Sequence, residues 1–209
     1  MTQHLWELIG ATSLAITTTV IGPTIFEHIK LKFFTTKKEI DMVRYDTEKN
    51  MIITEEIVTI REFLDADRIW VEQFHNGGHF LQSNKSIQKF SITYEDTKPG
   101  VSSVLTLFKD VPLSLYSKSM NEIMKHGHIY IPDYSDNSIE TFGLSSAANA
   151  TGTMSSYSVG LFDISTDKCM GILGVDYREK KRLNNDQKDY LIDKSNRLSG
   201  YLSVFLKSK

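Results

Sequence analysis

The sequence predicts an α+β fold: a single antiparallel sheet flanked by helices and preceded by one transmembrane helix and a connecting helix. Two strand-like runs, 156–164 and 169–177, are joined by the short turn STDK, so they must pair antiparallel. The run 87–95 alternates apolar and polar residues, as a half-buried strand does. The run 53–64 spaces its apolar residues as a helix does. One antiparallel sheet with helices packed against it is an α+β fold.

The composition indicates a folded core of ordinary kind. The chain has 209 residues, of which 40% are hydrophobic and 24% charged, enough for one domain plus an appendage. Its net charge of -2 does not favour a nucleic-acid partner, which would call for a basic chain. Cys169 is the one cysteine, which excludes an intramolecular disulfide and a four-thiolate metal site.

The N-terminal segment 1–29 is predicted to be a membrane anchor. Nineteen residues from Leu8 to Phe26 carry no charge. As a helix they would extend about 28 Å, close to the ~30 Å hydrocarbon core of a bilayer. The alternative is an amphipathic helix that packs on the domain or on a partner. With an anchor, the protein would contact membrane lipid as a single-pass protein of the inner (cytoplasmic) membrane.

Small residues and lysines refine this expectation. Ala11, Ala15 and Thr19 recur every four residues, a spacing that lets transmembrane helices approach closely, so a homo-oligomer through this helix is expected. Equally, small residues are common in weak anchors. The four lysines between residues 30 and 38 all follow the run, so the basic-residue rule places the C-terminal domain in the cytoplasm.

Segment 30–65 is predicted to be a connecting amphipathic helix. Ile53, Ile57, Ile60 and Leu64 follow 4-3-4 spacing and form an apolar stripe on one helix face. The stripe could pair with a second copy of the chain or pack on its own domain, and both interpretations remain open.

Strands are predicted to begin after Ala66. The run 68–74 is rich in aromatic and branched residues and ends at Asn-Gly-Gly, which is a hairpin-turn signal. The connection to the next strand is expected to be longer than a tight hairpin and to contain His79 and Phe80. In the second strand, 87–95, Phe90, Ile92 and Tyr94 are predicted to share one face.

A helix is predicted over 112–125, with Pro112 in its first turn and Gly127 at its end. Its predicted buried side is Leu113, Met120, Ile123 and Met124. A short strand at 128–132 and a long loop at 133–153 follow. The last helix, 186–206, is predicted to be capped by Asn184 or Asn185 and to bury Leu191, Leu198, Leu202 and Phe205.

This order of elements resembles GAF and PAS-type sensory domains over roughly residues 50–206. The stretches that carry the resemblance are FHNGG in the first hairpin and GLFDIS…GILGVDY before the last helix. The resemblance implies a GAF/PAS-like domain at 66–209 that binds a small ligand or a regulatory protein between its sheet and the covering loops, without catalytic activity.

A second resemblance is to the holins of T-even bacteriophages. It rests on the membrane segment followed by a charged helix and a PAS-like domain, and on the stretches ITYED, VPLSLYSKSMNEIMKHGHIYI and 170–202. It implies that the protein forms membrane lesions and times host lysis through a periplasmic soluble domain. The expected function is therefore a membrane-anchored, non-catalytic regulatory module, with the holin as its alternative.

Reactive side chains do not form a recognisable catalytic or metal motif. His75 and His79 are four apart, but the glycines between them prevent a helix that would align both as ligands. His126 and His128 alone do not complete a zinc site, which needs three or four ligands. Glu95 and Asp133 could act as a carboxylate pair in acid–base chemistry, but this interpretation is not favoured. Cys169 is expected to be a packed small side chain. We therefore expect no enzyme activity, no metal and no cofactor.

Six residues are predicted to border a ligand pocket, by analogy with the fold. They are Phe74, His75, Phe90, Tyr94, Glu95 and Tyr130. The aromatic members could instead fill the core. Gly171 and Gly174 in the strand GILGV indicate close backbone approach by a ligand or a crossing helix, and the helix is favoured.

Overall fold

The computed structural model describes residues 42–79, 83 and 85–207. The predicted anchor 1–29 and the first part of the connecting segment lie outside these residues, so the domain boundary near residue 29 stays a prediction. Within the described part of the chain, no helix is long and apolar enough to cross a membrane. From residue 48 onward the elements form one compact unit.

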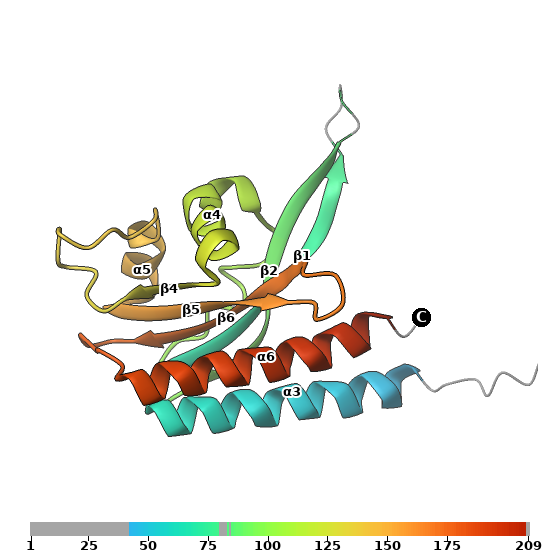
Figure 1. Ribbon diagram of the computed structural model, residues 1–209, viewed down its shortest axis with the longest axis horizontal. Coiled ribbons are helices and arrows are strands. Elements are labelled where there is room, and N and C mark those ends of the chain that lie inside the picture. Colours follow the sequence, from blue (N-terminus) through green and yellow to red (C-terminus); the bar gives the residue numbers. More distant parts are fainter. Residues whose placement is uncertain (1–41, 80–82, 84, 208–209) are drawn as a thin grey trace, which may run out of the picture. The chain divides into compact units, whose positions relative to one another are not determined.

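The unit is built on a six-stranded antiparallel sheet with the order β3-β2-β1-β6-β5-β4 (Figure 1). Its central strands, β1 and β6, pair directly although about a hundred residues separate them in the chain. The predicted α+β class with a single antiparallel sheet is confirmed. The strand bounds are β1 Arg68–His79, β2 Ser86–Thr97, β3 Val111–Pro112, β4 His128–Ile131, β5 Ser155–Phe162 and β6 Cys169–Tyr177.

Two long helices, α3 (Met42–Leu64) and α6 (Asn185–Lys207), lie side by side on one face of the sheet (Figure 1). The 4-3-4 stripe of α3 is fully buried there, so it packs on its own domain. The Lys194 ammonium on α6 contacts the Glu56 carboxylate on α3 at 2.7 Å, which ties the two helices together. We call this side of the sheet the helix face.

The start of α6 has the predicted cap. Asn184 Oδ1 accepts a hydrogen bond from the Gln187 backbone N–H at 2.8 Å, and Gln187 Oε1 accepts one from the Asn184 N–H at 3.1 Å. This reciprocal pair is a capping box, which satisfies amide groups that the helix leaves free. Leu191, Leu198 and Leu202 are buried as predicted, whereas the Phe205 side chain lies outside those described.

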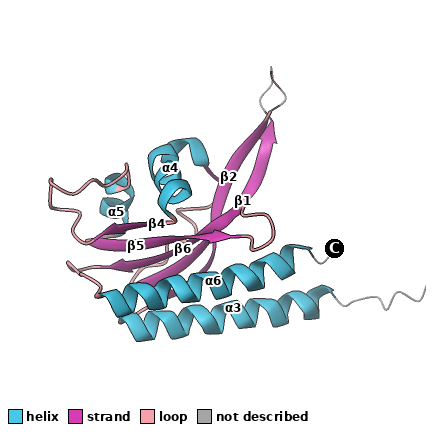
Figure 2. Cartoon of the chain, in the orientation of Figure 1, coloured by secondary structure: helices cyan, strands magenta, loops and turns pink. Residues whose placement is uncertain are grey.

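The other face of the sheet carries the shorter helices α4 (Ser117–His126) and α5 (Ser145–Thr151), as Figure 2 shows, and the 3-10 turn η2 (Leu113–Tyr116) precedes α4. We call it the cavity face. Helix α5 lies within the segment predicted as a loop; that prediction was wrong because three alanines, at 147, 148 and 150, favour a short helix there.

The helix predicted over 112–125 starts later than expected, and one residue of its predicted buried side is exposed. Pro112 belongs to β3 and precedes the helical turns, whereas Gly127 ends α4 in the left-handed region at φ 78°, as expected. Ile123 is buried, Leu113 and Met120 are half-buried, and Met124 is 53% exposed. Met124 was wrongly assigned because the buried face of α4 carries Ser119 and Ile123, four residues apart, and Met124 lies beyond that face. The helix also starts five residues later than predicted, at Ser117, after the 3-10 turn.

The Asn-Gly-Gly sequence does not form the predicted hairpin turn. Strand β1 continues through it to His79, with Asn76 opposite Gln88 and His79 opposite Ser86. The unequal spacing marks a bulge, and Gly78 supplies its positive φ of 99°. The Gln88 side-chain amide donates to Asn76 Oδ1 at 3.1 Å, which holds the extended strands together.

Candidate ligand-binding site

A cavity of about 90 Å³ lies between the cavity face of the sheet and the helices α4 and α5. Strands β1, β2, β5 and β6 form its floor, and the segment between β2 and β3 closes one side. Its main lining residues are Trp70, Glu72, Phe90, Ile92, Val104, Phe108, Tyr116, Ser119, Met120, Ile123, Tyr134, Leu144, Ala147, Ala148, Thr151, Thr153, Ser156, Ser158, Ile172 and Asp176.

Strand alternation brings Trp70 and Glu72 to this cavity. Successive side chains of a strand point to opposite faces, so Ile69 and Val71 enter the core of the helix face while their neighbours line the cavity. Gly174, opposite Trp70 on β6, leaves room for the indole: a Cβ there would lie 2.0 Å from a ring atom. A Cβ on Gly171 would meet the Glu72 carbonyl oxygen at 2.0 Å. The close approach inferred from these glycines is therefore to strand β1, and the favoured crossing helix was wrong.

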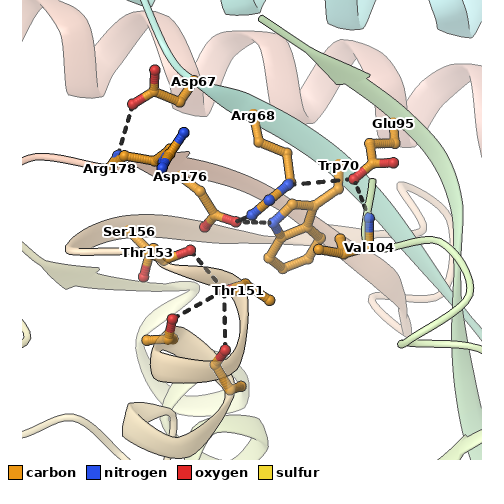
Figure 3. A network of polar contacts seen from close by, with 12 residues as sticks. Asp67, Arg68, Trp70, Glu95, Val104, Thr151, Thr153, Ser156, Asp176 and Arg178 are labelled. Carbon is orange, nitrogen blue, oxygen red and sulfur yellow. Dashed lines mark hydrogen bonds and ion pairs between the residues drawn. The ribbon is translucent and has the colours of Figure 1, made fainter. Parts of the chain in front are cut away.

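A buried ion-pair network adjoins the cavity (Figure 3). The Arg68 guanidinium donates to Asp176 Oδ2 at 3.1 Å and to the Ser102 carbonyl at 2.9 Å, and its Nε lies 3.4 Å from Glu95 Oε1. The Trp70 indole N–H donates to the same Asp176 oxygen at 3.0 Å. Glu95 in turn accepts from the Val104 backbone N–H at 2.9 Å. The network fixes the loop after β2 and the indole that lines the cavity.

Asp176 is the member of this network that lines the cavity. Burial raises the pKa of its carboxyl above the ordinary value, and the contacts with Arg68 and Trp70 oppose that rise. A buried acid with a buried base beside it is compensated rather than free. The Arg68 guanidinium is thus committed to Asp176, Glu95 and Ser102.

Glu72 lies on the same floor without such compensation. Its side chain is 5% exposed, and Oε1 has no hydrogen-bond partner within the described part of the chain. Burial raises the pKa of this carboxyl to about 8, because the charged form loses its hydration. The Glu72 charge in turn raises the pKa of Tyr116 and of Cys169, each after the larger effect of burial.

Hydroxyl groups on the opposite wall satisfy one another. Thr151 Oγ1 lies 2.8 Å from Thr153 Oγ1, and the Tyr134 hydroxyl lies 2.7 Å from Ser156 Oγ. Burial raises the pKa of Tyr134, so its hydroxyl stays protonated. Figure 3 shows the threonine pair on the α5 side of the site, across from the Arg68 network.

Two of the six predicted pocket residues lie at or beside this cavity. Phe90 is part of its lining, and Glu95 belongs to the adjoining network. Phe74 packs on the same face, in the cluster formed by Ile123, Ile129 and Ile172. Their roles in binding stay predictions.

The other three predicted pocket residues are not brought to the cavity. Tyr94 and Tyr130 pack against the core of the helix face, where the Tyr94 hydroxyl donates to Asn50 Oδ1 at 2.7 Å. A register shift between the pairs Val71–Tyr94 and Glu72–Ile92 places Tyr94 on the face opposite Ile92, so the prediction of one shared face was wrong. His75 Nε2 contacts Ser91 Oγ at 2.9 Å.

Sequence reasoning missed Glu72, Trp70 and Asp176. A signal was present: in RIWVEQF the period of two puts Trp70, Glu72 and Phe74 on one face. An acid among aromatic residues in mid-strand is unusual, because charged residues are rarely fully buried. That face was overlooked because the chain segment that covers it comes from residues far along the sequence.

The remaining reactive groups have separate surroundings. Among the described residues, no three His, Cys, Asp or Glu side chains are grouped as metal ligands. Cys169 Sγ donates to the Gly171 carbonyl at 3.3 Å, and burial raises the pKa of the thiol to about 11. Asp133 forms its ion pair with Lys180, and the hydrogen bond from Lys180 lowers the pKa of the Asp133 carboxyl to about 2.

Comparisons with known proteins identify the fold. No protein family matches the chain. No curated protein matches it significantly either. Solved structures do. A GAF domain from Synechocystis sp. PCC6803 in its photoproduct state superposes with a TM-score of 0.59 at 13% identity, covering 76% of this chain and 95% of that one.

Two further structures agree. A far-red cyanobacteriochrome photoreceptor gives a TM-score of 0.59 at 15% identity and covers 86% of this chain and 100% of its own. A phycocyanobilin-bound GAF domain from a cyanobacterial phytochrome gives 0.58 at 18% identity, covering 80% and 92% respectively. At such identities the likeness extends to the fold alone, and the chain from α3 to α6 has a GAF-like fold.

Proposed function

We propose that this protein is a regulatory module that binds a small molecule in the cavity and passes the event to the helices α3 and α6. The observation that carries the proposal is the cavity itself, bounded by the sheet of a GAF-like fold on one side and by α4 and α5 on the other. A concave apolar site with a few polar groups is the default ligand site of a protein. We expect no enzyme activity.

The size of the cavity favours a ligand much smaller than a bilin. One of the similar solved structures holds phycocyanobilin, a tetrapyrrole. Sites for drug-sized molecules have volumes of roughly 300–1,000 Å³. At about 90 Å³ this cavity suits a molecule of a few heavy atoms.

A short physical route joins the cavity to the helix face. Asp176 lines the cavity, and the next residue of β6, Tyr177, points to the opposite face. The Tyr177 hydroxyl donates to the carbonyl of Leu64 at 3.1 Å, in the last turn of α3. A ligand that shifts Asp176 would therefore bias the end of α3.

Thermal unfolding of the full-length chain tests the binding function. Small amines, amides and carboxylates of up to six heavy atoms would be added in turn to the protein and to the variant Ala147→Leu, which fills the cavity. A ligand of the native state at 100 times its Kd adds about 2.7 kcal/mol of stability. We expect at least one compound to stabilise the parent protein and not the variant. Equal responses of both proteins, or no response, would overturn the proposal.

We further propose that Leu8–Phe26 anchors the module in the inner membrane, self-associates there and leaves the C-terminal domain in the cytoplasm. The support is the uncharged length of this stretch and the lysines that follow it. A topology reporter fused to the C-terminus tests this in a bacterium. Cytoplasmic reporter activity in viable cells agrees with the proposal, whereas a periplasmic C-terminus with abrupt loss of viability favours the holin alternative.

A further inference from the structure

We propose that the ligand of the cavity is a small organic cation with at least one N–H group, an amine or a guanidinium, held by the Glu72 carboxylate among aromatic rings. This inference rests on the proposed binding function and names its ligand class. It follows from four properties of the cavity: an unmatched acceptor, the sign of its charge, its aromatic walls and its size.

The unmatched acceptor is Glu72 Oε1. The atom is buried and has no hydrogen-bond partner among the described residues, and Glu72 is only 5% exposed. Leaving a buried polar atom unpaired is destabilising, and more so for a charged group. A ligand that donates an N–H to this atom recovers that free energy.

The charge of the lining is acidic. Glu72 and Asp176 are its two ionisable carboxyls, and none of the described lining residues is lysine, arginine or histidine. Arg68 is the nearby cation, but it is bonded to Asp176 and Ser102. The network thus pairs Asp176 with Arg68 and leaves the Glu72 carboxyl for an external cation.

Aromatic rings line the same cavity as the Glu72 carboxyl. Trp70, Phe90, Tyr116 and Tyr134 come from four different segments and all line the cavity. The Phe90 and Tyr116 rings meet edge to face, with centroids 5.4 Å apart. Ring faces attract a cation, and more strongly where water is excluded. An anion would gain nothing from the ring faces and would be repelled by the ionised form of Glu72.

The size limits the cation to about four or five heavy atoms. A protein cavity of about 150 Å³ accommodates benzene, which has six. The present cavity has about 90 Å³. Methylguanidinium and trimethylammonium are of suitable size, and both carry the required N–H.

Cation binding should release a proton. Burial raises the pKa of Glu72 to about 8, so the carboxyl of the empty protein is largely protonated at pH 7. The bound cation requires the carboxylate, and the displaced proton goes to the buffer.

Other titratable groups near the site are Tyr116, Tyr134, Asp176 and Cys169, with Ser119 and Thr151 as the polar groups from α4 and α5. The phenols and the thiol have raised pKa values and stay neutral below pH 8.

Titration calorimetry of the full-length chain tests the inference, with methylguanidinium as the probe and N-methylurea as its uncharged counterpart of the same shape. The affinity for methylguanidinium should rise by up to about tenfold per pH unit from pH 6 to 8. The apparent enthalpy should change with the ionisation enthalpy of the buffer, because a proton is released.

The variant Glu72→Gln keeps the shape and removes the charge, and we expect it to weaken methylguanidinium binding by about thirtyfold or more. The matched control Glu179→Gln removes a carboxyl that is 70% exposed and should bind as the parent does. The comparison with N-methylurea needs no variant, so it holds even where a substitution disturbs folding.

Three results would overturn the inference: equal affinity for N-methylurea, affinity independent of pH, or unchanged binding by Glu72→Gln. If small neutral molecules or anions bind to the cavity while methylguanidinium and trimethylammonium do not, the cation class is wrong but the binding function stands. If no small molecule of any class binds, the proposed function fails as well.

Discussion

The two faces of the sheet differ in how completely their buried groups are matched. The helix face holds a continuous apolar core in which Ile57, Leu173 and Leu191 are fully buried. The cavity face, made by alternate residues of the same strands, holds a void, an ion-pair network and a buried carboxyl oxygen, Glu72 Oε1, with no hydrogen-bond partner among the described residues. Val71 and Glu72 are neighbours in the chain, yet the first is part of the packed core and the second lines the void.

Polar groups on the helix face are mostly satisfied. The Tyr157 hydroxyl donates to the Lys181 carbonyl at 2.7 Å and accepts from the Leu183 N–H at 3.0 Å. Tyr130 is the exception, since its buried hydroxyl has no partner among the described residues, but it is neutral. A neutral hydroxyl is far less costly to bury than a carboxylate. Strand alternation can therefore place a packed core on one face of a sheet and a candidate binding site on the other.

The largest effect is expected from the network beside the cavity. Arg68→Ala would leave Asp176 and Glu95 buried without their counter-charge, and breaking such a pair typically costs 3–5 kcal/mol, so we expect about that loss in the free energy of unfolding. Urea denaturation at pH 7 measures it. Arg178→Ala, at an exposed arginine, is the control, and a loss no larger than that of the control would show that the network is not important for folding.

Core truncations compare the two faces directly. Ile57→Ala should cost about 2–5 kcal/mol, because the packed core of the helix face leaves a new void. Ile123→Ala should cost less, since this residue already borders a cavity and has fewer contacts to lose. The same denaturation experiment on both variants ranks them. The reverse order would mean that the void is closed in solution.

The next effect is on the pH dependence of stability. The pKa of Glu72 is raised from 4.5 to about 8 by burial, so the folded state retains a proton that the unfolded state has lost. The contribution of Glu72 to the free energy of unfolding is therefore greatest below pH 4.5. It falls as the pH rises from 4.5 to about 8, by at most about 1.4 kcal/mol per pH unit. Glu72→Gln should remove that slope, and its stability relative to the parent should grow from pH 5 to 8. Parallel pH profiles of the two proteins would contradict this.

The smallest effect is expected from the cap of α6. Asn184→Ala removes the side chain that accepts from the Gln187 N–H and should cost about 1 kcal/mol. Thermal melting of the variant and the parent protein measures this loss, and an unchanged melting temperature would show that the cap does not stabilise α6.

Regular periodicity made much of the fold predictable. The stripe from Ile53 to Leu64, the pair β5–β6 and the cap at Asn184 all depend on residues close in sequence. Local deviations were not predictable in this way. A bulge at Gly78 lies where a turn was predicted, and the register shift between Val71 and Glu72 placed Tyr94 on the helix face.

The candidate site was less predictable than the fold. Phe90 and Glu95 were predicted by analogy with the fold, and they lie in the cavity lining and in the adjoining network respectively. Glu72 was missed because a charged residue in a strand is usually solvated. Its burial depends on α4, α5 and the segment before β3, whose positions follow from packing of distant residues rather than from local pattern.

The most direct test of this account is the titration of Glu72 itself, followed by NMR of a ¹³C-labelled glutamate carboxyl and assigned with Glu72→Gln. We predict a midpoint near pH 8 in the ligand-free protein, as expected for a buried carboxyl without a partner. Saturating methylguanidinium should lower that midpoint by at least about one unit, since the cation favours the charged form. A midpoint near the ordinary 4.5, unchanged by the cation, would contradict the account.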